Sequence, residues 1–132
     1  MLRYAIEWAG GMAVDALVRH LERRLHRGLR WMRGADLASW ELHEDGRALG
    51  LPSDGPARLL LFVHGTFSST VGSFGALAAT GAGSDLLARA RRAYDAVVGF
   101  DHATLSETPL ANARDLMERL RTVGATPRRS TR

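Results

Sequence analysis

The chain has 132 residues, of which 45% are hydrophobic and 24% charged, the composition of an ordinary globular domain. Its net charge of +4 comes from arginine alone, because the sequence contains no lysine, and it has no cysteine. The lack of cysteine excludes a disulfide framework, thiolate catalysis and a cysteine-ligated metal. The scattered arginines predict no specific nucleic-acid surface. Of the three functions that we consider for the chain, binding to nucleic acid or to an acidic surface is the weakest.

No apolar run reaches the roughly 20 residues of a membrane-spanning helix, so no transmembrane segment is predicted. The N-terminus also lacks the order of a signal peptide, since Glu7 and Asp15 interrupt its apolar positions. Together these features favour a cytoplasmic protein.

Residues 1–30 are predicted to form an amphipathic helix. Apolar residues recur there at helical spacing: Ile6, Ala9, Ala13, Val14, Leu17, Val18, Leu21 and Leu25. This spacing is typical of a helix that covers a core or a sheet. Trp8 and the nearby arginines suggest a helix lying on a membrane surface instead, but acidic residues on the polar face argue against that alternative.

The apolar period changes to two in residues 39–50. Trp40 and Leu42 alternate with polar residues, and the Asp-Gly pair at 45–46 can turn the chain. We therefore expect a small antiparallel hairpin ahead of the main strands.

Leu59–Val63 is an unbroken apolar run, which suits a strand buried on both faces. A second apolar strand is expected over residues 94–100, with a helix between the two strands and another helix beginning near Thr108 and Pro109. Strand, helix and strand at this spacing form a parallel crossover. The residues that follow the strands, His64 and His102, should therefore emerge at the same edge of the sheet.

The segment His64-Gly65-Thr66-Phe67-Ser68 after a hydrophobic strand resembles the oxyanion loop of α/β-hydrolases, in particular lipase- and esterase-like members. The resemblance covers residues 58–123, including residues 100–104 and the helix around Asn112. It implies an α/β fold, namely a partial α/β-hydrolase-type sheet with parallel central strands, a leading β-hairpin and flanking helices. We expect one such domain over residues 1–124 and a disordered arginine-rich tail over residues 125–132.

The resemblance also implies roles for the loop residues. The backbone N–H groups of Thr66 and Phe67 would donate to the oxyanion of acyl transfer, which needs fixed donors, while His64 and Gly65 would support the loop. Substrates in the full-length family are small-molecule or lipid esters, and neither a cofactor nor a metal is expected.

The resemblance breaks off before the nucleophile. The sequence contains no G-x-S-x-G motif, and Ser68, Ser69 and Ser73 have no base at a defined spacing. The chain is then the N-terminal piece of a longer hydrolase, the product of a shifted or truncated reading frame, or a domain that has lost the chemistry. We predict an inactive fragment of a serine esterase, whose partner is another copy or the missing C-terminal half. The alternative is a non-catalytic interaction module that pairs through an open sheet edge.

Overall fold

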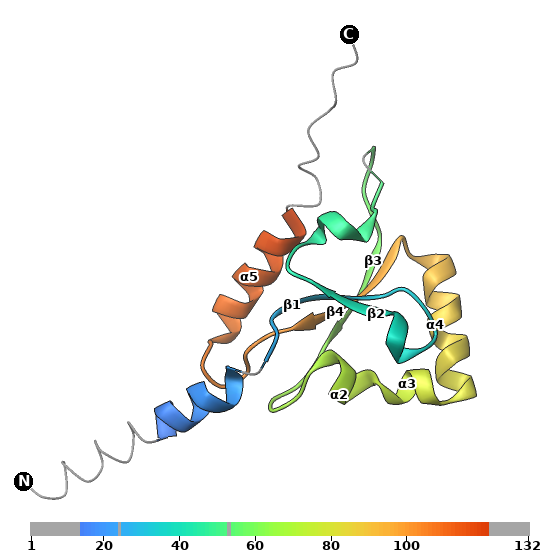
Figure 1. Cartoon of the computed structure of the whole chain (residues 1–132). Coiled ribbons are helices and arrows are strands. Elements are labelled where there is room, and N and C mark those ends of the chain that lie inside the picture. The colour runs from blue at the N-terminus through green and yellow to red at the C-terminus, as the bar shows by residue number, and fades with distance from the viewer. Residues whose placement is uncertain (1–13, 24, 53, 122–132) are drawn as a thin grey trace, which may run out of the picture.

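One mixed sheet lies at the centre of the computed structural model, which describes residues 14–23, 25–52 and 54–121 (Figure 1). Its strands are β1 (Gly28–Met32), β2 (Trp40–His43), β3 (Leu59–Val63) and β4 (Ala96–Asp101), in the spatial order β2-β1-β4-β3. The helices are η1 (Leu37–Ser39), η2 (Gly46–Leu49), α2 (Thr70–Phe74), α3 (Ala76–Ala79), α4 (Gly81–Ala93) and α5 (Pro109–Arg121), and residues 14–22 are also helical. The α/β class expected from the sequence is therefore present.

Helices cover both faces of the sheet, giving three layers (Figure 1). On one face, Val98 and Phe100 of β4 pack with Leu116 and Leu120 of α5. On the other face, Val97 packs in a cluster with side chains of α2, α3 and α4: Phe74, Leu77, Ala78, Leu87 and Ala90. The two clusters alternate along β4, as the side-chain period of a strand requires.

The strand pairing agrees with the sequence in one place and differs in another. β3 and β4 are parallel, with Leu61 opposite Val98. The two central strands, however, are β1 and β4, and these pair antiparallel. β3 lies at the edge and is only half-buried, whereas every residue of β4 is buried. The apolar run Leu59–Val63 therefore predicted a strand correctly but did not predict its position at the edge of the sheet.

The predicted helix over residues 1–30 is wrong at its C-terminal end, because the helix stops at residue 22 and β1 begins at Gly28. Residues 14–22 are helical, and residues 1–13 and the predicted tail over 125–132 lie outside the described part of the chain. The apolar stripe of the helix is not buried, since Val14, Leu17 and Leu21 are exposed. Helical spacing fixed the element but could not specify which face meets the domain.

The predicted hairpin over residues 39–50 is also wrong, because the strand that begins at Trp40 pairs with an earlier strand and not with residues 47–49. β2 pairs antiparallel with β1, Trp40 lying opposite Met32, and residues 46–49 form η2 instead of a returning strand. The Asp45 carboxylate accepts a hydrogen bond from the Arg47 N–H, so the Asp-Gly pair starts a short helix. A leading antiparallel pair exists, but its first strand is Gly28–Met32.

Only part of the apolar stripe of α5 packs on the sheet. Leu116 and Leu120 pack on the sheet, but Leu110 and Met117 are exposed. The predicted start is confirmed, because Thr108 Oγ1 accepts a hydrogen bond from the Ala111 N–H.

Gly99 lets α2 approach β4 closely. A Cβ atom at Gly99 would lie 2.1 Å from Cγ2 of Thr70, the first residue of α2, and Thr70 is fully buried. The start of α2 therefore rests directly on the backbone of the central strand.

We expect Gly99→Ala to lower the free energy of unfolding by about 2 kcal/mol or more, because overpacking a buried contact displaces backbone on both sides. Urea denaturation followed by circular dichroism measures the change. Gly81→Ala is the matched control, since a Cβ atom at Gly81 meets nothing within 4 Å and alanine favours the helix. Equal stability of the two variants would contradict the close packing of Thr70 on β4.

Candidate functional site

The carboxyl ends of β3 and β4 form a crevice. The chain leaves β3 toward α2 on one face of the sheet and leaves β4 toward α5 on the other face. Two adjacent parallel strands whose connections depart to opposite faces create a topological switch point, the usual ligand site of an open α/β sheet. The architecture itself therefore selects this edge as the candidate site.

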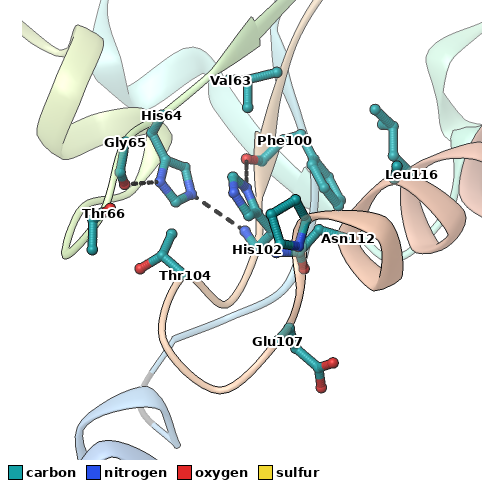
Figure 2. Close-up of a pocket in the computed structure, with 12 residues that line it drawn as sticks. Val63, His64, Gly65, Thr66, Phe100, His102, Thr104, Glu107, Asn112 and Leu116 are labelled. Atoms are coloured by element: carbon teal, nitrogen blue, oxygen red, sulfur yellow. Dashed lines mark hydrogen bonds between the residues drawn. The ribbon is translucent and has the colours of Figure 1, made fainter.

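A cavity of about 390 Å³ lies at this edge (Figure 2). It is lined by Val63, His64, Gly65, Thr66, Phe100, His102, Thr104, Glu107, Pro109, Asn112, Ala113 and Leu116. The residues come from the end of β3, the end of β4 and the first turns of α5. Three loop residues expected from the sequence, His64, Gly65 and Thr66, belong to this lining, whereas Phe67 does not.

Two stacked imidazole rings form one wall of the cavity. The ring centroids of His64 and His102 lie 4.3 Å apart, and those of His102 and Phe100 lie 4.9 Å apart with nearly parallel planes. His64 and His102 thus emerge at the same edge, as the parallel crossover predicts. The stack fixes both rings.

Backbone partners set the tautomer of His64. Its Nδ1 lies 2.9 Å from the Gly65 carbonyl oxygen, which can only accept, so Nδ1 carries the hydrogen. Its Nε2 accepts a hydrogen bond from the His102 N–H at 3.3 Å. With both nitrogens engaged in this way, His64 is a neutral ring that joins the two strand ends (Figure 2).

The Asp101 carboxylate of β4 is bonded to β1 and to the start of α2. Its Oδ1 accepts from the Thr70 N–H at 2.6 Å and its Oδ2 accepts from Arg30 Nε at 2.9 Å. Arg30 also donates to the Trp40 carbonyl oxygen. Because His64 Nε2 lies 3.9 Å from Oδ1, beyond hydrogen-bond range, Asp101 is a structural anion and not an orienting partner of His64.

The loop after His64 has an unusual backbone. Phe67 has φ 58°, the one positive φ of a non-glycine residue in the described ranges, and its side chain is 77% exposed. A bulky residue in this region is strained, and such strain is common where a loop serves a function. Phe67 N–H donates to Thr104 Oγ1 at 3.1 Å, whereas Thr66 N–H has no partner in the described part of the chain.

His102, Thr104 and Asn112 complete the site, although no motif in the sequence assigned them a role. Asn112 Nδ2 donates to the Ala103 carbonyl oxygen at 2.7 Å and so holds the loop after β4 against α5. For His102 and Thr104 the signal in the sequence was position, because polar residues that follow a buried strand gather at the carboxyl edge of the sheet.

Glu22 of the N-terminal helix holds the loop that follows β4. Its carboxylate accepts hydrogen bonds from the three successive N–H groups of residues 104–106, at 2.7 to 3.0 Å. Burial raises the pKa of Glu22, but the Ser106 side chain and these N–H groups outweigh burial and bring the pKa below its ordinary value of 4.5. The helix is thus held by its acidic residue and not by its apolar stripe.

The described ranges contain neither a complete catalytic triad nor a group of three potential metal ligands. Ser68 Oγ and Ser73 Oγ bond to each other at 2.7 Å and contact no histidine nitrogen. No helix within 14–23, 25–52 and 54–121 is long and apolar enough to cross a membrane.

We expect Glu22→Gln to lower the free energy of unfolding by about 1 kcal/mol at neutral pH, since an amide is a weaker acceptor for three N–H donors than a carboxylate. A carboxyl group with a lowered pKa stabilises the fold above its unfolded-state pKa and loses that effect as pH falls through the folded-state value. The difference from wild type should therefore shrink below about pH 4.5.

Urea denaturation of both proteins at pH 7 and near pH 3.5 measures this difference. Asp15→Asn is the control, because it removes the same charge from an exposed position of the same helix. A difference that persists unchanged at the lower pH would contradict the role of the Glu22 carboxylate.

One of the comparisons with known proteins gives a match. A family model, the domain of unknown function DUF7379, matches residues 27–129, a range that contains all four strands and both loops of the cavity. No curated protein and no solved structure matches the chain. Because the family model covers more than half of its length, the chain belongs to the DUF7379 domain family.

Proposed function

We propose that the chain is the N-terminal part of a serine esterase- or lipase-like α/β-hydrolase. It supplies the oxyanion loop, and residues outside this sequence supply the nucleophile, acid and base. By itself the chain binds but does not hydrolyse carboxylic esters. The observation that carries the proposal is the Thr66 backbone N–H, which has no partner in the described part of the chain and belongs to a residue that lines the cavity.

The environment of Thr66 supports this role. His64 bonds to the Gly65 carbonyl oxygen and to the His102 N–H, which fixes the backbone just before Thr66. A preorganised donor of this kind stabilises developing negative charge without reorganising during the reaction. Phe67, the second expected donor, instead bonds to Thr104 Oγ1. Its N–H could join Thr66 only after that hydroxyl turns away.

The topology supports a place for the missing elements. β4 is flanked by β1 and β3, whereas β3 has one neighbour in the described sheet. Parallel strand–helix–strand connections are right-handed in nearly all cases. Since α5 lies on the face opposite α2–α4, a parallel strand following α5 would lie on the far side of β3. A nucleophile carried at the end of that strand would then reach the cavity.

We expect dimethyl phosphate, a tetrahedral anion with two short ester groups, to move the Thr66 amide proton downfield in a saturable NMR titration. The reason is that the free N–H would donate to the anionic oxygen. Thr66→Ala, which keeps the N–H, should retain the effect, and Thr66→Pro, which removes the donor, should lose binding.

Neutral dimethyl sulfone, of similar shape, should give a smaller shift. In the same samples a fluorophosphonate probe should label no serine. Binding that persists in Thr66→Pro would overturn the assigned donor, and stoichiometric labelling of a serine would show that a nucleophile is present after all.

The alternative function, an interaction module, is favoured by the same open edge. An edge strand exposes unpaired N–H and C=O groups and pairs readily with another strand. Val63 at the end of β3 is 53% exposed and adds an apolar contact. Pairing through β3 would join two copies, or join the chain to a partner that contributes the missing strand.

We expect Val63→Lys to reduce self-association at least severalfold, because a charged side chain on an edge strand discourages pairing. Light scattering coupled to size-exclusion chromatography measures the association. Val71→Lys is the matched control, since Val71 is an exposed valine of α2, away from the edge. A wild-type chain that stays monomeric at high concentration would rule out pairing between two copies.

A further inference from the structure

We infer that the cavity binds a ligand whose hydroxyl group donates a hydrogen bond to His102 Nε2. This inference deepens the proposed function and rests on it for the ester itself, because it specifies that the substrate carries a hydroxyl group. The two nitrogens of the His102 ring, and the wall on which the ring stands, carry the argument.

The His102 ring presents an acceptor. Nδ1 lies 3.1 Å from the Phe100 carbonyl oxygen, which can only accept, so Nδ1 carries the hydrogen of the neutral ring. Nε2 is then a lone-pair acceptor, and it has no partner in the described part of the chain. The other neutral tautomer would bring two acceptors, Nδ1 and the Phe100 carbonyl oxygen, together, and a 180° turn of the ring would replace the Nδ1–H donor by a Cδ2–H group.

The acceptor is held in place and remains accessible. His102 is only 8% exposed and its ring is stacked between those of His64 and Phe100. The described buried atoms without a hydrogen-bond partner do not include Nε2, so this atom keeps access to solvent. Since His102 lines the cavity, a ligand in the cavity can form a hydrogen bond with Nε2. A ligand that covers Nε2 must supply a donor in place of water, because a buried acceptor without a partner is costly.

Asn112, which lines the same cavity, offers a second hydrogen-bond acceptor. Asn112 uses its Nδ2 to bond the Ala103 carbonyl oxygen, which leaves Oδ1 as a second acceptor beside the cavity (Figure 2). The Glu107 carboxylate at the same cavity bonds to Arg27 and adds no donor. Acceptors on this wall select a ligand group that donates a hydrogen bond.

Apolar side chains form the rest of this wall. Val63, Phe100 and Leu116 line the cavity together, and their burial by a ligand favours a short aliphatic chain. The ligand that fits both parts of this wall carries a hydroxyl group on a short aliphatic chain. In an ester substrate, this group is a hydroxyl on the aliphatic chain.

Two isomers separate the hydroxyl donor from the apolar chain. 1-Hexanol and pentyl methyl ether have the same atoms, but only the alcohol can donate. We expect 1-hexanol to bind the whole chain about fivefold to tenfold more tightly, the contribution of roughly one hydrogen bond. In a long-range nitrogen–proton NMR spectrum, the alcohol should also shift His102 Nε2 and leave Nδ1 nearly unchanged.

Variants locate the effect. His102→Phe keeps an aromatic ring in the stack and should bind the two isomers equally. Ala113→Leu fills part of the cavity from the exposed surface of α5 and should weaken both, whereas Arg114→Leu, on the same helix but outside the lining, should weaken neither. If His102→Phe fails to fold, the two isomers on wild type and the Ala113→Leu variant still test the inference.

Equal affinity of wild type for the two isomers, absence of alcohol binding, or binding without a shift of His102 Nε2 would overturn the inference. The Thr66 amide, monitored in the same samples with dimethyl phosphate, tests the proposed function separately. A response at His102 without one at Thr66 supports the hydroxyl site and rules out the proposed oxyanion role of the Thr66 N–H. A response at Thr66 without one at His102 supports the oxyanion role of the loop and rules out the hydroxyl site.

Discussion

The buried carboxylate of Asp101 is the interaction on which the rest of the structure depends. It accepts from Arg30 on the neighbouring strand and from the Thr70 N–H at the start of α2, so one side chain fixes a strand pair and the first helix after the loop. Removing one partner of a buried ion pair leaves the other charge unpaired, at a cost of several kcal/mol. The loop 64–69 spans the distance between β3 and this fixed point, which leaves few conformations open to it.

Asp101 and His102 are neighbours in the sequence but have different roles, because their side chains point to opposite faces of the sheet. Asp101 faces the α2 side of the sheet, and His102 turns toward Phe100 and the cavity on the α5 side. Alternation along an extended segment therefore separates a structural anion from an available imidazole. His64 joins the two strand ends with both of its nitrogens. The candidate site thus depends on elements that a change at Asp101 would displace together.

The sequence predicted those parts of the fold that depend on local chemistry. The apolar runs gave β3 and β4, Thr108 and Pro109 gave the start of α5, and the shared edge of His64 and His102 followed from a parallel connection. It failed where a distant partner decides the outcome. β1 forms because its residues pair with β4, and Glu22 is buried because N–H groups of residues 104–106 bind its carboxylate. No pattern within residues 14–32 encodes those partners.

The central pairing of β1 with β4 has a consequence for synthesis of the chain. Arg30 and Asp101 are 71 residues apart, so β1 and β2 leave the ribosome long before their neighbour in the sheet exists. Until then Leu29 and Met32, fully buried in the finished domain, remain in contact with water. Long-range pairing of this kind slows folding and lengthens the period in which nascent apolar segments can be captured by chaperones.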